Sequence, residues 1–298
     1  MSAGSTRYGI AVGVDGSAAS NAAAFWAAHE AAMRCVPLTL VHMVNAAEPV
    51  NPEMSLAVDA AVGQADEGRR VLEEAFKIAG DAGPPDRKFP ISCQLRWSRP
   101  VPTLAEMSEK AEMVVVGSSG RGAVGRVLLG SVSSGVVRSA KCPVAVIRAE
   151  ASYLPHSNQA PVLVGTDCSP ASESAIAIAF DEASRRGVTL TVLHAWSDIA
   201  VYQVPWLDWQ SDAERGVAEY LAVWQERYPD VEVRRVVTLD HPGRALINES
   251  EAAQLVVVGS HGRGGAAAML LGSVSNAVVH SVHTPVIVAR PCSDRVAE

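Results

Sequence analysis

The sequence predicts an α/β protein made of two repeated, doubly wound domains, and three observations lead to this prediction. The same series of strand and helix signals occurs twice along the 298 residues. The strand signals are continuous runs of valine, isoleucine and leucine, which are typical of a parallel sheet covered on both faces. Helical segments separate these runs, and right-handed crossovers between parallel strands give an open sheet with helices on both faces.

The duplication is clearest near the end of each half. Residues 112–148 align without a gap with residues 254–290, and 21 of the 37 aligned positions are identical. The starts of the two halves also match, with "VGVDGSAAS" from Val12 and "VGTDCSPAS" from Val164. A repeat of roughly 150 residues is too long for a solenoid unit, so each copy is a whole domain.

The length suits two ordinary domains. We predict one domain over residues 1–150 and a second over residues 151–298. The junction lies near residues 149–161, "AEASYLPHSNQAP", where prolines and polar residues replace the periodic pattern.

Each half is expected to contain five strands and four helices in strict alternation. In the first half, runs such as "PLTLVHMV" and "EMVVVGS" predict strands at residues 8–15, 37–44, 91–97, 112–118 and 142–148. Alanine-rich or amphipathic stretches predict helices at residues 18–34, 58–79, 102–111 and 130–140. The second half repeats the order, with strands at 161–167, 188–196, 231–239, 254–260 and 284–290, and helices at 169–186, 212–227, 243–252 and 272–282.

Composition excludes several classes of protein. The net charge is −7 and no run of lysine and arginine occurs, so nucleic acid is not expected as a partner. No apolar run reaches the ~18 residues of a membrane span, and no signal-peptide pattern opens the sequence. The five cysteines are an odd number without a Cys-x-x-Cys pair, which argues against a disulfide framework or a zinc ribbon. We therefore expect a cytoplasmic protein that does not bind membranes.

A glycine-framed loop occurs once in each half, as "GSSGRGAVGRVLLGS" from Gly117 and "GSHGRGGAAAMLLGS" from Gly259. Each loop follows a predicted strand and leads into a predicted helix, whose free N–H groups favour a phosphate. Its glycines would permit positive φ angles and a close approach of the backbone to a ligand. The glycines could instead serve only to turn the chain. We favour a phosphate site, because glycines, arginine, serine and loop length are kept while the middle of the loop diverges.

Other nucleotide motifs are missing from the sequence. The stretch "GRGAVGRV" has the glycine spacing of a Walker A loop but ends in Arg-Val instead of Lys-Ser/Thr. No Gly-x-Gly-x-x-Gly follows the first strand, and no Gly-x-Ser-x-Gly nucleophile elbow is present.

An aspartate ends the first predicted strand of each half, Asp15 and Asp167. Either aspartate could cap the following helix, since aspartate is favoured at that position. Ser17 and Ser169 could also cap those helices, with Pro170 at the first helical position of the second one. Capping by the serines would leave the aspartates to face a ligand.

At these residues the sequence resembles the universal stress protein family in its tandem, ATP-binding form. The family motif is G-x2-G-x9-G-[S/T], and the resemblance covers essentially the whole chain. It is matched by Gly117, Gly120, Gly130 and Ser131, and again by Gly259, Gly262, Gly272 and Ser273. The resemblance implies a five-stranded parallel sheet of order 3-2-1-4-5 in each half. A ligand then lies outside the carboxyl ends of strands 1 and 4, where the winding reverses.

The resemblance also implies which residues bind ATP, with Mg²⁺ held mainly by phosphates and water. In the first half these are Gly13, Asp15, Met43, Gly117, Ser118, Ser119, Gly120, Arg121, Gly122, Ala123, Arg126, Gly130, Ser131, Val132 and Ser133. In the second half they are Gly165, Asp167, Asp198, Gly259, Ser260, His261, Gly262, Arg263, Gly264, Gly265, Gly272, Ser273, Val274 and Ser275. Because Arg126 aligns with Ala268, tighter binding is expected in the first half.

Two functions of different classes fit these features. One is a module for stress and growth regulation that responds to bound ATP, has two ATP sites per chain and hydrolyses ATP slowly at most. The other is a genuine ATPase or an AMP-forming ligase. We expect the first, because the sequence shows no activated nucleophile, acidic metal cluster or Ser-Gly-Gly loop. The resemblance further suggests that the short last strands of the halves pair in a pseudo-dimer, and that the chain forms a homodimer or binds an unidentified protein.

Overall fold

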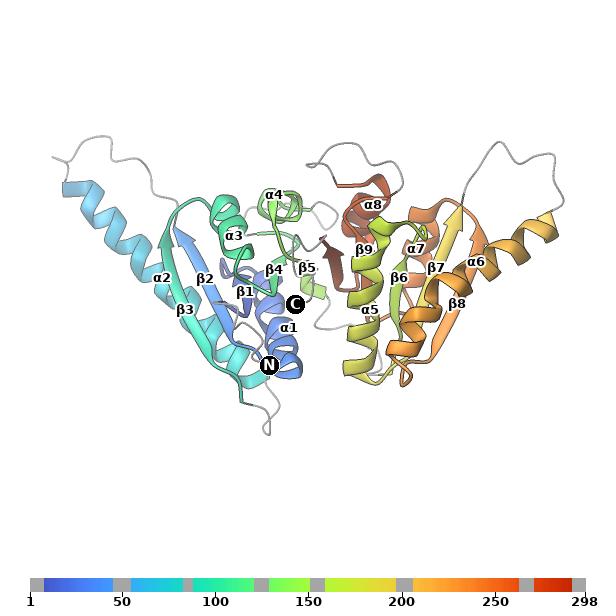
Figure 1. Cartoon of the computed structure of the whole chain (residues 1–298). Coiled ribbons are helices and arrows are strands. Elements are labelled where there is room, and N and C mark those ends of the chain that lie inside the picture. The colour runs from blue at the N-terminus through green and yellow to red at the C-terminus, as the bar shows by residue number, and fades with distance from the viewer. Residues whose placement is uncertain are drawn as a thin grey trace. The chain divides into compact units, whose positions relative to one another are not determined.

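The computed structural model describes residues 8–44, 55–82, 88–120, 129–150, 159–196, 206–262 and 271–290. The chain divides into two compact units, Met1–Tyr153 and Leu154–Glu298. The domain boundary predicted after residue 150 adjoins residues 151–158, which lie outside the described residues, so its exact place stays a prediction. Each unit contains its own strands with helices packed on them (Figure 1).

The first unit has the predicted doubly wound fold. Its strands are β1 (Ile10–Gly13), β2 (Leu38–Val44), β3 (Ile91–Trp97), β4 (Met113–Gly117) and β5 (Val144–Ile147), all paired in parallel in the order β3-β2-β1-β4-β5. Its helices are α1 (Ala18–Arg34), α2 (Ser55–Ala82), α3 (Pro100–Ser108) and α4 (Ser131–Ser139). Helix α1 packs against α2, and α3 packs against α4. The predicted fold class and strand order are therefore confirmed.

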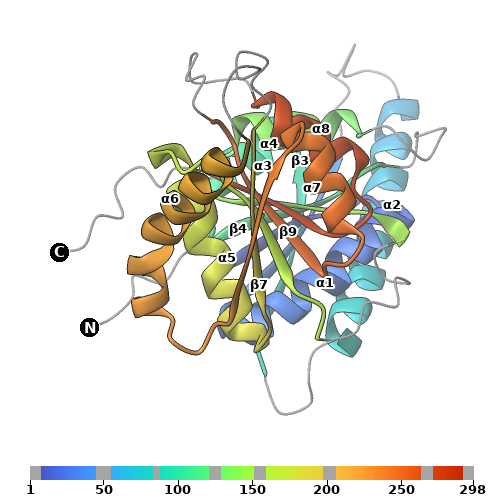
Figure 2. The ribbon, with the colours of Figure 1, turned by 90° about the vertical axis from the view of Figure 1, so that its right-hand side faces the viewer.

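The second unit repeats this arrangement. Its strands β6 (Val162–Gly165), β7 (Leu190–Trp196), β8 (Val233–Leu239), β9 (Leu255–Gly259) and β10 (Val286–Ala289) are parallel and have the order β8-β7-β6-β9-β10. The helices are α5 (Glu173–Arg186), α6 (Trp206–Arg227), α7 (Pro242–Ser250) and α8 (Ser273–Ser281). Figure 2 shows α5 and α6 on one side of β7 and β9, and α7 and α8 on the other.

The helices of the second unit that differ most from the sequence expectation are α5 and α6. Helix α6 begins at Trp206 rather than at residue 212, because no glycine or proline interrupts residues 206–211. The helix expected over residues 169–186 divides into a 3₁₀ turn, η2 (Pro170–Ser172), and helix α5. Proline at the first position favours such a tight first turn, since it has no N–H to lose.

Small residues bring helix α1 close to strand β4. The alanine-rich face of α1 is fully buried, including Ala23, Ala24 and Ala27. At Gly117, where β4 ends, a Cβ atom would lie 2.7 Å from the backbone carbon of Ala19. This close packing places the start of α1 directly beside the end of β4.

The contact between α3 and α4, and the equivalent contact between α7 and α8, each pair a glycine with a larger residue, and the glycine lies on opposite helices in the two units. In the first unit, a Cβ atom at Gly135 of α4 would lie 2.7 Å from a methyl carbon of Val101 of α3. In the second unit the sizes are reversed, and Ala277 of α8 faces Gly243 of α7, with 3.4 Å from its Cβ to the Cβ position of Gly243. In each unit only one of the two facing positions carries a side chain larger than hydrogen. The effects of substitutions at the two positions should therefore depend on each other.

We expect Gly135→Ala to destabilise the first unit by about 1–3 kcal/mol, because the new methyl group overlaps Val101. The double variant Val101→Gly/Gly135→Ala, which copies the second unit, should recover most of this loss. Thermal unfolding followed by circular dichroism measures both. Gly80→Ala in α2 is the matched control: nothing lies within 4 Å of its Cβ position, so helix propensity should make it neutral or stabilising. Equal effects of Gly135→Ala and Gly80→Ala would contradict the proposed contact.

Candidate functional site

Each unit has a cavity at the carboxyl ends of its first and fourth strands, β1 and β4 or β6 and β9. The winding of the sheet reverses between these strands, which is where open α/β sheets bind ligands. The cavity volume is about 410 Å³ in the first unit and about 530 Å³ in the second. Both volumes suit a small organic ligand.

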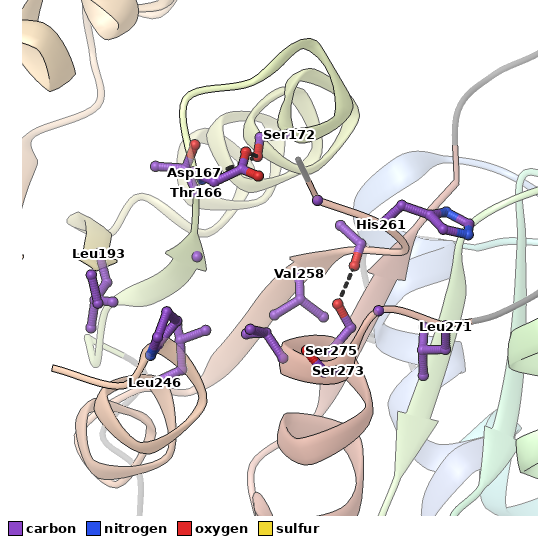
Figure 3. A pocket seen from close by; sticks show the side chains of 17 residues that line it. Thr166, Asp167, Ser172, Leu193, Leu246, Val258, His261, Leu271, Ser273 and Ser275 are labelled. Carbon is purple, nitrogen blue, oxygen red and sulfur yellow. Dashed lines mark hydrogen bonds between the residues drawn. The ribbon is translucent and has the colours of Figure 1, made fainter. Parts of the chain in front are cut away.

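The fold brings most of the predicted site residues to these cavities. In the first unit the cavity is lined by the predicted residues Gly13, Asp15, Met43, Gly117, Ser119, Gly120, Gly130, Ser131, Val132 and Ser133. In the second unit it is lined by the predicted residues Gly165, Asp167, Gly259, His261, Gly262, Gly272, Ser273, Val274 and Ser275 (Figure 3). Residues far apart in sequence therefore meet at one place in each unit.

Two predicted residues, Ser118 and Ser260, are buried and do not line the cavities. Their backbones instead anchor the ends of the glycine loop: the carbonyl of Ser118 accepts from Gly130 N–H at 2.7 Å, and that of Ser260 from Gly272 N–H at 2.9 Å. Eight other predicted residues lie outside the described residues, namely Arg121, Gly122, Ala123, Arg126, Asp198, Arg263, Gly264 and Gly265.

Sequence reasoning missed the apolar side of each cavity. Pro100 and Leu104 of α3 line the first cavity, and Pro242 and Leu246 of α7 line the second. A repeated Pro-x3-Leu pattern after the third strand of each half could have identified them. The remaining residues that we did not predict are Val14, Ser20 and Val116 in the first unit and Thr166, Ser172, Leu193, Ala195, Val258 and Leu271 in the second.

Another part of each cavity is formed by the start of a helix that packs against α3 or α7. Helix α4 begins at Ser131 and helix α8 at Ser273, with glycines, Gly130 and Gly272, at their N-cap positions. Glycine has no side chain to cap the first N–H groups, and neither N-cap residue makes a side-chain cap hydrogen bond. The first turns of both helices line the cavities, so their N–H groups and positive dipole ends are available to an anion.

Asp15 lies beside the start of α1 without capping it. The cap is Ser17, as predicted, whose hydroxyl accepts from Ser20 N–H at 3.2 Å. Asp15 Oδ1 accepts from Ser17 N–H at 3.0 Å. Its Oδ2 faces the glycine loop, 2.7 Å from the Cβ position of Gly120. The carboxylate therefore borders the cavity from the side of α1.

Asp167 is held more elaborately in the second unit. Its Oδ1 accepts from Ser169 N–H at 3.0 Å, from the Ser169 hydroxyl at 2.6 Å and from the Ser172 hydroxyl at 2.7 Å. Ser169 occupies the N-cap position with Pro170 after it, as the sequence suggested, but its hydroxyl donates to Asp167 and makes no cap hydrogen bond. Asp167 Oδ2 faces the Cβ position of Gly262 at 3.0 Å.

The loop glycines within the described residues do not adopt the positive φ angles that glycine permits. Positive φ occurs at Gly9, Gly16 and Gly187 instead. Gly117 and Gly120 are required by packing, because Cβ atoms there would meet the Ala19 backbone and the Asp15 carboxylate, each at 2.7 Å. The glycines therefore let helix, loop and aspartate converge, which leaves the backbone open toward the cavity.

A tyrosine and a cysteine lie next to Asp167. The Tyr220 hydroxyl donates to the Ser169 carbonyl at 3.4 Å. Burial, followed by the nearby charges of Glu173, Cys168 and Asp167, raises the pKa of Tyr220 to about 12, so its hydroxyl keeps its proton at neutral pH. Cys168 has φ +57°, where the first unit has Gly16 at +78°.

His42 in β2 and His194 in β7 come directly before a cavity residue, and each is hydrogen-bonded to a backbone carbonyl. His42 Nδ1 lies 2.7 Å from the Val14 carbonyl, and His194 Nδ1 lies 2.9 Å from the Thr166 carbonyl. Each histidine ties the second strand to the turn that carries the aspartate. His261 Nδ1 lies 3.0 Å from the Ser260 hydroxyl, and its ring points away from Asp167 (Figure 3).

The described residues contain no group of three or more histidine, cysteine, aspartate or glutamate side chains that could hold a metal ion. Taken with the contacts above, each cavity combines an uncapped helix start, an aspartate and an apolar side. Such a site can bind an anionic ligand that also has an apolar part.

Comparison with known proteins accounts for this duplicated site. The model of the universal stress protein family matches residues 9–148 and again residues 160–290. The chain belongs to the universal stress protein family. Both segments together cover most of the chain, so it is a tandem member with two family domains.

Relatives in mycobacteria share this tandem length. A universal stress protein of Mycobacterium tuberculosis strain H37Rv is 57% identical over 97% of this chain and 99% of that protein. Another, of Mycolicibacterium smegmatis, is 45% identical over 96% of this chain and 98% of that protein. The crystal structure of a universal stress protein from Archaeoglobus fulgidus has a TM-score of 0.72 at 21% identity, over 95% of this chain and 99% of that one, and supports the fold.

Of the helices within the described residues, none is both long and apolar enough to cross a membrane.

Proposed function

We propose that each domain binds one adenine nucleotide, with ATP as the physiological ligand. The uncapped starts of α4 and α8 carry this proposal, since they line cavities at the switch points of the two sheets. The phosphates lie at these helix starts, and the base lies against the apolar side formed by α3 or α7. Mg²⁺ accompanies ATP and is held by phosphates and water.

The aspartates fit the sugar of such a ligand. Asp15 and Asp167 line the same cavities as the apolar side and the helix start, and the Oδ2 atom of each faces the glycine loop. A carboxylate oxygen accepts hydrogen bonds from ribose hydroxyls, as acidic residues do at dinucleotide-binding sites. The chain then acts as a cytoplasmic module for stress and growth regulation, in which bound ATP changes the surface offered to a second copy or another protein.

We expect the chain to bind two adenine nucleotides. Native mass spectrometry of the full chain as purified should show an added mass of up to two nucleotides, and calorimetry with Mg²⁺ and ATP should give two sites per chain. Released phosphate, measured in the same samples, should accumulate far more slowly than at the ~10 s⁻¹ of a median enzyme. A chain that binds no adenine nucleotide, or turns ATP over at ordinary enzyme rates, would contradict the proposal.

A further inference from the structure

The two cavities differ at the end of the second strand. Met43 of β2 lines the first cavity, and Ala195 of β7 lines the second. The two residues are structurally equivalent, because each follows a histidine, His42 or His194, that binds the carbonyl of the residue before the aspartate. The smaller side chain occurs beside the larger cavity, about 530 Å³ against about 410 Å³.

The exchange of methionine for alanine makes the second cavity deeper than the first. Side chains two residues apart on a strand lie on the same face of the sheet, so Val41 lies behind Met43 and Leu193 behind Ala195. Val41 is fully buried and is not among the residues that line the first cavity, whereas Leu193 lines the second. Met43 Cε lies 3.8 Å from the Cβ position of Gly13, which places the methionine between the strand ends. Ala195 leaves that space open.

The added depth lies at the apolar side of the cavity. Figure 3 shows Leu193 and Leu246 on one side and Ser273 and Ser275, at the start of α8, on the other. With the phosphates at α8, the deeper side takes the base of the nucleotide. This step rests on the proposed function.

We infer that Ala195 makes the second site a receptor for adenine nucleotides with a small substituent on the base, which Met43 excludes from the first site. A substituent at the edge of the base enters the space above Leu193 in the second cavity. In the first cavity it meets Met43, which is packed between Gly13 and the wall of the site. One added methylene or similar group changes affinity by about tenfold or more when a pocket has no room for it.

The test counts bound molecules of a base-substituted nucleotide on the full chain. N6-ethyl-ATP and 2-methylthio-ATP carry groups on two edges of the base, and each is added at the lowest concentration at which ATP fills both sites. Native mass spectrometry should show one molecule of at least one of them per native chain. Met43→Ala should raise that number to two, and Ala195→Met should lower it to none.

ATP itself is the reference in every variant, and far-UV circular dichroism checks the fold. Ala195→Val should weaken the substituted nucleotide relative to ATP by less than Ala195→Met does. The inference is overturned if two ATP molecules bind per chain but the number of bound substituted nucleotides is the same in the native chain, in Met43→Ala and in Ala195→Met. The proposed function stands in that case. If ATP does not bind at all, both are overturned.

Discussion

A Gly120→Asp chain should bind one ATP where the native chain binds two. The Cβ position of Gly120 lies 2.7 Å from Asp15 Oδ2, so any side chain there displaces the carboxylate that borders the site. An aspartate also adds a second negative charge where the phosphates enter. Two like charges about 4 Å apart repel by about 4 kcal/mol at the effective dielectric near a protein surface. We therefore expect at least about a hundredfold loss of affinity in the first domain.

Gly262→Asp should do the same in the second domain, because Gly262 faces Asp167 Oδ2. Alanine at each position separates the steric effect from the charge. Gly120→Ala, with 2.7 Å to its aspartate, should weaken binding more than Gly262→Ala, with 3.0 Å. Both glycines are exposed, so thermal unfolding should change little. Calorimetry that still finds two sites with the native affinities in Gly120→Asp would show that the loop does not contact the ligand.

The duplication and the apolar strands made the fold predictable from the sequence. Strand β4, "MVVVG", is buried from Met113 to Val116, and such an apolar run is typical of the centre of a covered sheet. The position of the site followed, because Asp15 ends β1 and the glycine loop begins where β4 ends. These signals are local, and parallel pairing brings them together without further information.

The roles of individual glycines could not be predicted in the same way. Gly117 is needed because the backbone of α1 crosses it, and Gly120 because the Asp15 carboxylate occupies its side-chain position. Both causes are contacts between segments roughly a hundred residues apart, as the sequence shows, so no local pattern distinguishes them from a turn or a ligand contact. Ser118 was assigned to the site from the family resemblance, which does not reveal that its side chain is buried.

Removal of Asp167 should affect both the stability of the second domain and its affinity for ATP. Asp167→Ala leaves the Ser169 N–H and two serine hydroxyls without the oxygen that they share. A hydrogen bond to a charged group contributes about 1.5–3 kcal/mol, so we expect the free energy of unfolding of this domain to fall by at least about 1.5 kcal/mol. Urea unfolding of the full chain, followed by tryptophan fluorescence and circular dichroism, measures this loss.

Asp167→Ala should also weaken ATP binding in the second domain by about tenfold or more, since an acceptor for the ribose is lost. Ser169→Ala is the matched control, because Ser169 donates to Asp167 but does not line the cavity. It should cost stability and leave the affinity for ATP nearly unchanged. Asp167→Asn keeps an acceptor oxygen and should bind ATP with intermediate affinity. If Asp167→Ala loses stability but keeps the native affinity for ATP, the aspartate only organises the turn before α5, and the alternative of a purely structural carboxylate is correct.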